Sequence, residues 1–263
     1  MKKYIILAIL SVFIILPVMA SGAKDGLAGV QERGKLVVGT SADYAPYEFH
    51  IMIDGKDSIV GFDIEIAKAL AADLGVELEI QDIGFDGLIQ SLNSKKIDVV
   101  ISGMTPTEER MQSVDFSIIY YLTQQSVLVL AETADKYKDI SDLAGLPVGA
   151  QLASIQEELV KNEMEESRLV ALGKIPDLVL ELKNKKVEAL VLGTPVATGY
   201  VNANKDLALS AINFDASEDG SAVAVRKGNE DLLAEIDKSL KRMMADGTID
   251  RLVAEANILN VTE

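Results

Sequence analysis

The stretch LIQSLNSKKIDVVISG, residues 88–103, decides the fold class, because it joins an amphipathic helix to an apolar strand through a short lysine turn. Apolar residues recur at helical spacing in its first half, and IDVVISG (97–103) is typical of a buried strand. The stretch LVLELKNKKVEALVLG (178–193) repeats this pattern at a constant offset of 90 residues. The two units predict two similar lobes, although any amphipathic helix that feeds a buried strand shares some of this likeness.

Strand-like and helix-like runs alternate along the rest of the chain. Strands are expected at 35–41, 76–83, 97–103, 126–131, 146–151 and 222–229, and helices at 62–75, 85–96, 154–164 and twice near the C-terminus. Repeated strand–helix–strand units favour parallel sheets that are covered by helices on both faces. The sequence therefore predicts an α/β protein with mostly parallel sheets.

Composition excludes several function classes. The chain has 263 residues and a formal net charge of −16, which argues against nucleic acid or an anionic membrane surface as a partner. It contains no Cys, which excludes disulfides, thiolate metal sites and cysteine nucleophiles. The single histidine, His50, leaves little basis for a histidine-dependent hydrolase. We find no phosphate-binding loop and no metal-ligand pattern in the sequence, so neither a metal nor a cofactor is expected.

The first 20 residues have the three parts of a secretory signal peptide. Two lysines precede an apolar run at 4–16, and small residues follow at the spacing that signal peptidase requires. Ser21 stands where a lipoprotein would carry Cys, so we expect a secreted, periplasmic protein without a lipid anchor. An uncleaved membrane anchor is the alternative. Loss of the leader would take the net charge from −16 to −18, and the glycine-rich segment 21–34 is expected to be a flexible leader.

The segment SGMTPTEER (102–110) is a candidate anion site at the end of an expected strand. Gly103 lets another molecule approach the backbone, and Thr105 offers a hydroxyl. Thr107 precedes two glutamates and predicts a helix cap, and free N–H groups at a helix start favour an anion. Arg110 adds a planar two-pronged donor that suits a carboxylate. The alternative for Arg110 is an ion pair with a neighbouring surface acid.

Further candidates follow other expected strands. Ser41 is a small polar residue at a strand end, and Tyr44 beside it has a ring that could stack on a ligand. Phe85 opens a helix, where packing in the core is its default role. Gln151 and Ser154 lie at the start of the helix in the second half, and Ser154 predicts an N-cap whose neighbouring amides could also face a ligand.

At this point a family resemblance is clear. GFDIEIAKALAADL (61–74) resembles the signature of family 3 of the extracellular solute-binding proteins, which serve amino-acid ABC importers. The similarity runs from about Lys35 to Asn257. The supporting motifs occur in the family's order: GTSADYAPYEF, FDGLIQSLNSKKIDVVISGMTPTEER, GAQLASIQEE and DGTIDRLVAEAN. The resemblance implies a periplasmic-binding-protein fold, in which two α/β lobes are joined by two hinge crossings and close over a ligand.

The resemblance also implies where the lobes divide. The crossings are expected near 121–125 and 219–222. The first lobe would then comprise 28–122 plus 222–263, and the second lobe would comprise 126–218.

The same resemblance assigns roles to the candidate residues. Arg110 would pair with the α-carboxylate of an amino acid, Thr105 would bond to it through the hydroxyl, and the Gly103 carbonyl would face the ammonium. Tyr44 and Phe85 would sandwich the side chain. The expected ligand-binding set is Ser41, Tyr44, Phe85, Ser102, Gly103, Thr105, Arg110, Gln151, Ser154, Ile155, Gly193 and Thr194.

Two positions depart from the family pattern. Relatives usually carry an acid that pairs with the α-ammonium where this chain has Gly193, and Thr194 offers only a neutral oxygen. Loss of that ion pair implies that the ammonium is held differently or that the ligand differs. Some relatives have Asp at the position of Ser41, so the serine puts a strongly basic ligand in doubt.

The resemblance also implies a contribution from the second lobe, where Ser154 and the Ile155 amide would complete the carboxylate site.

The function that the resemblance implies is a monomeric, secreted binding protein that delivers an amino acid or a similar solute to a membrane permease. We expect no enzymatic activity. One alternative is a sensory module that docks on a receptor. Another is a cyclohexadienyl-type dehydratase on the same fold, which needs a general acid in the cleft. No acid in the motifs is an obvious candidate for that role, although Glu48 stays open as one.

Overall fold

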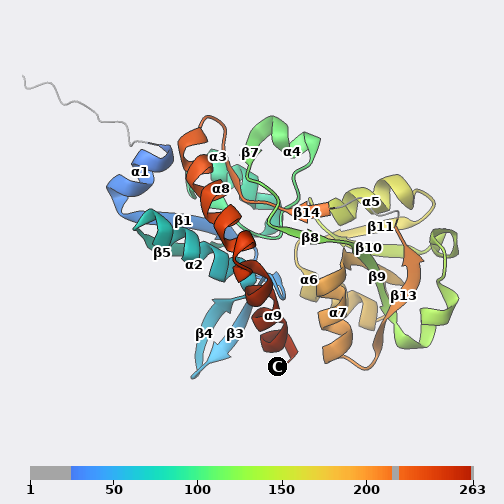
Figure 1. Ribbon diagram of the computed structural model, residues 1–263. Coiled ribbons are helices and arrows are strands. Elements are labelled where there is room, and N and C mark those ends of the chain that lie inside the picture. The colour runs from blue at the N-terminus through green and yellow to red at the C-terminus, as the bar shows by residue number, and fades with distance from the viewer. Residues whose placement is uncertain (1–24, 215–218, 262–263) are drawn as a thin grey trace, which may run out of the picture.

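The computed structural model describes residues 25–214 and 219–261, so the expected signal peptide lies outside the described residues. Within them the chain forms two lobes that lie side by side, each built on a five-stranded sheet with helices packed around it (Figure 1). The predicted α/β, two-lobed fold is confirmed.

The first lobe contains the sheet β5–β1–β6–β15–β7. Its strands are β1 (Lys35–Thr40), β5 (Glu77–Asp82), β6 (Val99–Val100), β7 (Val114–Phe116) and β15 (Ala224–Arg226). A smaller sheet joins β2 (Asp43–Tyr44), β3 (Glu48–Ile53) and β4 (Lys56–Val60). The helical segments are α1 (Gly26–Arg33), α2 (Phe62–Leu74), the 3-10 turn η1 (Phe85–Gly87), α3 (Leu88–Asn93), α4 (Glu108–Ser113), α8 (Glu230–Ala245) and α9 (Thr248–Val261).

The second lobe contains the sheet β11–β10–β12–β9–β13. Its strands are β9 (Gln125–Leu130), β10 (Pro147–Gln151), β11 (Arg168–Leu172), β12 (Ala189–Gly193) and β13 (Leu207–Asn213). Its helical segments are the 3-10 turns η2 (Ala131–Lys136) and η3 (Ile140–Leu143) and the helices α5 (Ile155–Glu163), α6 (Ile175–Lys183) and α7 (Thr194–Ala203).

The repeated sequence unit forms the same structure in both lobes. After α3 and after α6 the chain turns through a lysine with positive φ, 63° at Lys95 and 59° at Lys185. The Lys95 N–H donates to the Leu92 carbonyl at 3.1 Å, and the Lys185 N–H donates to the Leu182 carbonyl at 2.9 Å. Each turn leads into a strand at the centre of its sheet, β6 or β12. The repeat at an offset of 90 residues thus corresponds to the likeness of the two lobes.

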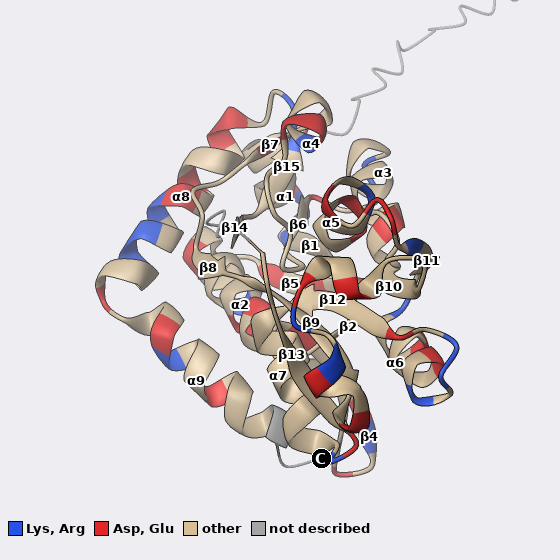
Figure 2. Ribbon diagram, turned by 90° about the vertical axis from the view of Figure 1, so that its right-hand side faces the viewer, with Lys and Arg blue, Asp and Glu red and all other residues tan. Residues whose placement is uncertain are grey.

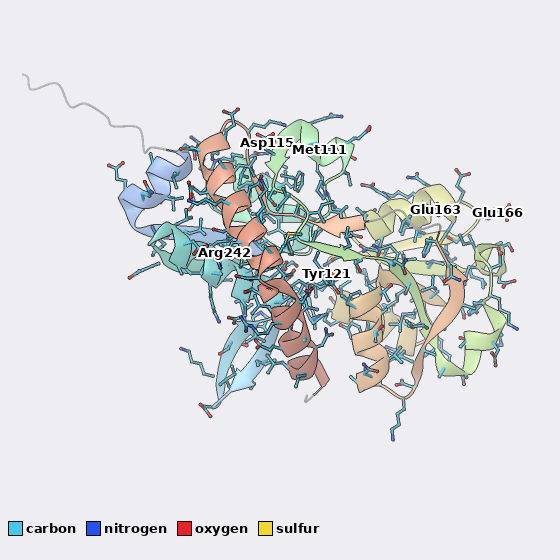
Figure 3. The ribbon with its side chains drawn as sticks, viewed as in Figure 1. Met111, Asp115, Tyr121, Glu163, Glu166 and Arg242 are labelled. Atoms are coloured by element: carbon cyan, nitrogen blue, oxygen red, sulfur yellow. The ribbon has the colours of Figure 1, made fainter. Side chains whose placement is uncertain are left out.

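In each five-stranded sheet the fourth strand runs antiparallel to the other four. β15 pairs antiparallel with β6, and β9 pairs antiparallel with β12. These two strands directly follow the crossings between the lobes, so the chain enters each of them from the hinge side. The crossings are β8 (Tyr121–Thr123) and β14 (Asp219–Ser221), which pair antiparallel with Tyr121 opposite Ser221. Tyr121 lies at this junction (Figure 3).

The expectation of a flexible leader at 21–34 is wrong for its described part, because Gly26–Arg33 is helix α1. The Asp25 carboxylate caps this helix by accepting from the Gly26 N–H at 2.9 Å, and it forms ion pairs with Arg226 and Lys95. Gly34 ends the helix with φ 66°. The cap partners lie far away in the sequence, which hides them from local pattern analysis.

Acidic side chains are spread over helices of both lobes, including α4, α5, α6, α8 and α9, rather than gathered on one element (Figure 2). On α8, Arg242 offsets part of this charge by pairing with Asp73 of α2 at 2.6 Å. This distribution agrees with a role of the net charge in solubility.

Candidate functional site

A small cavity lies between the lobes. It is reached from the carboxyl ends of β1 and β6 in the first sheet and of β10 in the second, the edge at which open α/β sheets bind ligands. Of the twelve residues expected from the sequence, ten line it: Ser41, Tyr44, Phe85, Ser102, Gly103, Thr105, Arg110, Gln151, Ser154 and Ile155. Asp43, Glu48 and Gln156 complete the wall.

Arg110 is held at one end of this cavity by contacts that reach both lobes. Thr107 caps α4 as expected, since its hydroxyl accepts from the Arg110 N–H at 3.2 Å. The guanidinium donates to the Thr105 carbonyl at 2.7 Å and to the Ala153 carbonyl of the second lobe at 2.8 Å. Its carbon lies 5.4 Å from the centroid of the Phe85 ring. The side chain is buried, and this burial lowers the pKa of Arg110, although its two carbonyl contacts leave N–H groups for a further acceptor.

The second-lobe wall is built from the start of α5. Ser154 caps this helix, as expected, by accepting from the Glu157 N–H at 3.2 Å, while its own hydroxyl donates to the Gln151 carbonyl at 2.6 Å. Ile155 is the first helical residue, and N–H groups in a first turn have no acceptor within the helix. Gln156 donates to the Gln125 side chain at 2.8 Å and to the Tyr44 hydroxyl at 3.4 Å. This wall offers neutral hydrogen-bonding groups.

Two acids line the same cavity. Glu48, on β3, is fully buried; its Oε1 accepts from the Ser102 hydroxyl at 2.7 Å, and its Oε2 has no hydrogen-bond donor among the described residues. Asp43, on β2, accepts from the Ser41 hydroxyl at 3.1 Å and, across the cleft, from the Ile175 N–H at 3.1 Å. Burial raises the pKa of Glu48 well above its usual range and raises that of Asp43. A cation in the cavity would offset this desolvation.

The remaining two expected residues do not line the cavity. Gly193 backs onto Tyr44: a Cβ at position 193 would lie 2.6 Å from the Tyr44 hydroxyl oxygen, and the Gly193 backbone hydrogen-bonds to that hydroxyl. Thr194 donates to the Gln124 carbonyl at 2.9 Å and contacts the Ser126 hydroxyl at 2.8 Å. The tyrosine therefore occupies the space beside Gly193 that a side chain would need.

Sequence reasoning did not include Asp43, Glu48 and Gln156 in the site. Both acids stand in the motif GTSADYAPYEF, on either side of Tyr44, so their proximity to an expected ring was a usable signal. Gln156 follows the expected N-cap by two residues. Burial and the contacts across the cleft, which distinguish these side chains, are tertiary features.

Across 25–214 and 219–261 no group of three or more His, Cys, Asp or Glu side chains is arranged to hold a metal ion. Within the same ranges no helix is both long and apolar enough to cross a bilayer.

Comparison with known proteins shows which family the chain resembles in sequence and structure. Residues 36–256 match the family model described as bacterial extracellular solute-binding proteins, family 3. The arginine-binding extracellular protein ArtP of Bacillus subtilis (strain 168) is 40% identical over 255 residues, which cover 96% of each chain. The amino acid ABC transporter substrate-binding protein AbpA of Streptococcus pneumoniae, solved with bound L-arginine, superposes with a TM-score of 0.88 at 39% identity, covering 90% of this chain and 100% of that one.

A second similar structure bears on catalysis. The ancestral amino acid-binding protein AncCDT-1, described as a precursor of cyclohexadienyl dehydratase, has a TM-score of 0.80 at 35% identity and covers 87% of this chain and 98% of its own. All three proteins are named as binding proteins. The match to the family model and the identity to ArtP over nearly the whole chain show the family. This chain belongs to the bacterial extracellular solute-binding proteins of family 3.

Proposed function

We propose that this protein captures an amino acid with a cationic side chain, L-arginine being the first candidate, and delivers it to the permease of an ABC importer. One observation carries the choice of ligand. The cavity combines Arg110 with a fully buried carboxylate, Glu48, whose Oε2 lacks a donor among the described residues. Ionising a buried carboxyl group without a partner is costly and a cation can offset that cost, so the site favours a ligand with a carboxylate at one end and a cation at the other.

The contacts suggest how such a ligand is held. Its α-carboxylate takes the free N–H groups of Arg110, with the Thr105 hydroxyl and the Ile155 N–H as further donors. Its aliphatic stem passes the rings of Tyr44 and Phe85. The cation then reaches the acidic wall. With glycine at position 193, the α-ammonium has neutral acceptors such as the Gly103 carbonyl.

The cavity is small, with about 20 Å³ open to the centre of a water-sized sphere, which favours a small solute over a peptide. A peptide ligand would need a larger opening between the lobes.

Closure is proposed to occur about β8 and β14, with lobes at 28–122 plus 222–263 and at 126–218. The contacts from Arg110 to Ala153 and from Asp43 to Ile175 link the lobes. Both would have to break for the cleft to open, so they belong to the closed state.

Calorimetry with three related ligands tests the proposal. L-Citrulline has nearly the shape of arginine without its charge, and agmatine keeps the guanidinium but lacks the carboxylate. Hydrogen bonds to charged groups contribute about 1.5–3 kcal/mol, so citrulline should bind roughly 10- to 100-fold more weakly than arginine. Agmatine should lose the Arg110 contact and bind weakly as well. Tighter binding of citrulline or of another neutral amino acid would disprove the cationic preference.

We further propose that the protein is monomeric, resides in the periplasm and has no enzymatic activity. Glu48 is a buried acid in a cleft, and one similar structure is named as a precursor of a dehydratase, so catalysis merits its own assay. Incubation with prephenate or arogenate should give no aromatic product above the uncatalysed rate. Formation of that product, abolished in Glu48→Gln, would establish an enzyme instead.

A further inference from the structure

Behind the cavity wall lies a second buried carboxyl group, which the proposed ligand contacts do not use. Asp63, on α2, is fully buried, and it accepts from the Tyr120 hydroxyl at 2.8 and 2.9 Å and from the Gly103 N–H at 2.8 Å. Glu48, also fully buried, faces it within hydrogen-bonding reach. Two carboxyl groups thus share one buried site, and Glu48 also lines the cavity.

Among the described residues, the groups that donate hydrogen bonds to this pair carry no positive charge. Its donors are the hydroxyls of Ser102 and Tyr120 and the backbone N–H of Gly103, all neutral. The other titratable side chains that act on the pair or respond to it are the acid Asp43, on β2, and the phenols Tyr44 and Tyr47. Two like charges at one buried site cannot both stay ionised without a compensating cation.

The surroundings of Glu48 Oε2 indicate how the negative charge of the Glu48–Asp63 pair is reduced. It has no donor among the described residues, and its neighbouring acceptor is the Asp63 carboxyl. Two carboxylates repel each other, but a carboxyl and a carboxylate form a hydrogen bond when one proton lies between them. One proton therefore both satisfies Oε2 and removes one charge.

We propose that Glu48 and Asp63 share one proton in the ligand-free protein, carried mainly by Glu48, and that a bound cationic amino acid displaces it. This rests on the proposed function for the identity of the ligand. All members of the cluster belong to the first lobe, so the pair is present whether the cleft is open or closed. The cation of the ligand takes over the charge compensation, and the proton leaves to solvent.

The direction of the pKa changes agrees with this arrangement. Burial raises the pKa of Asp63 to about 6 and that of Glu48 well above its usual range. Asp63 is the better stabilised anion because it accepts from both Tyr120 and Gly103, whereas Glu48 accepts from Ser102 alone. The proton consequently resides on Glu48.

The exchange predicts a pH dependence of affinity with a definite sign. Between the lower pKa of the ligand-bound pair and the higher pKa of the ligand-free pair, binding releases one proton, so the Kd falls about tenfold for each pH unit of increase. Above that range the proton is already lost and the dependence ends. Below it both states are protonated, and arginine binds weakly with little dependence on pH.

Calorimetry of arginine binding in buffers with different ionisation enthalpies measures the released protons directly. About one proton per bound arginine is expected at pH 7 in the wild type. Asp63→Asn provides an amide donor for Glu48, which then stays ionised, so binding should persist with no proton released. Glu48→Gln should bind weakly and release none. Glu65→Gln, an acid on the exposed face of the same helix α2, is the matched control and should behave as the wild type.

Infrared spectroscopy of the ligand-free protein separates this inference from the proposed function. The carbonyl band of a protonated carboxylic acid should be present at pH 7 and lost in Glu48→Gln, with circular dichroism confirming that the variant is folded. Arginine binding without proton release, or absence of the band, would overturn the inference while leaving the arginine proposal standing. A band that persists although arginine does not bind would support the shared proton and would refute both the displacement and the proposed ligand.

Discussion

Gly193 and Tyr44 offer a test of cleft closure, because they belong to different lobes and meet across the cleft. A methyl group at position 193 would lie 2.6 Å from the Tyr44 hydroxyl oxygen but 3.6 Å from the ring carbon that carries it. The first distance is a severe clash, and the second is an ordinary van der Waals contact. Gly193→Ala should therefore disfavour closure only while the hydroxyl is present.

The magnitude follows from the clash. Overpacking of a well-packed site costs about 1–3 kcal/mol, which corresponds to a rise in Kd of roughly 5- to 150-fold. Tyr44→Phe removes the hydroxyl and its bonds to Gly193 and Gln156, and it weakens binding modestly by itself. In that background the added methyl fits, so the double variant should bind nearly as well as Tyr44→Phe alone. The expected coupling energy is at least about 1 kcal/mol.

Isothermal calorimetry on the four proteins measures the cycle, and melting of the ligand-free proteins provides the control. The two residues do not touch when the lobes are apart, so Gly193→Ala should leave the ligand-free melting temperature unchanged while it weakens binding. Equal weakening in the wild-type and Tyr44→Phe backgrounds would refute the argument. So would wild-type affinity in Gly193→Ala.

Three further predictions concern the ligand clamp, the cap of α1 and the lysine turns of the two lobes. Arg110→Ala should weaken the binding free energy of arginine by about 2–5 kcal/mol, since it leaves the ligand carboxylate unpaired. Arg110→Lys should recover only part of this loss, because lysine lacks the two-pronged geometry of the guanidinium. Equal affinities of the two variants in calorimetry would contradict this. Asp25→Ala should lower the free energy of unfolding by about 1–2 kcal/mol at pH 7 through loss of the α1 cap. Because Arg226 holds the pKa of Asp25 below its usual range, the difference in unfolding free energy from the wild type should shrink as the pH falls below 4. Urea denaturation at several pH values measures this difference, and a constant difference would exclude the ionised cap. Lys185→Gly should stabilise by about 0.5–1 kcal/mol by relieving a positive φ, since the ion pair that it loses joins two exposed side chains, Lys185 and Glu132. Lys95→Gly should gain less because its partner Asp25 is more buried than Glu132, and equal shifts in melting temperature would show that the Asp25 pair contributes no more than the exposed one.

The two-lobed fold was accessible to sequence analysis because its signals are local. The turn at Lys95 and Lys185 recurs with the same hydrogen bonds, and the helix that precedes it and the strand that follows it can be recognised from short-range periodicity. The antiparallel fourth strands and helix α1 were harder to predict. Their positions depend on where the chain crosses between lobes and on Asp25 meeting Arg226, which lies about 200 residues away along the chain.

The candidate site also combines residues that local sequence patterns predicted with residues that they did not. Thr107 and Ser154 were predictable as helix caps, and each marks a cavity wall. Ser41 instead suggested that a basic ligand is disfavoured, since it replaces an acid. The structure brings Asp43 and Glu48 to the same wall, which is the basis for the opposite proposal. Their burial is fixed by contacts with other elements, and a single sequence does not show such contacts.

The distribution of charge over the cleft determines at which step, ligand encounter or cleft closure, the ionic contacts with the ligand form. Nine lining residues come from the first lobe, including Arg110, Asp43 and Glu48, and the four from the second lobe are uncharged. A zwitterionic, cationic ligand therefore meets all of its ionic partners on the open first lobe, before the cleft closes. Closure then adds the hydrogen bonds of Arg110 to the Ala153 carbonyl and of Asp43 to the Ile175 N–H, and the contact of Tyr44 with Gly193, but among the lining residues it adds no further ionic partner for the ligand. Salt should accordingly weaken the initial encounter and leave the closing step nearly unchanged, and stopped-flow measurements at two ionic strengths distinguish these steps. A closing rate that falls with salt would place an ionic partner of the ligand on the second lobe and would contradict this order.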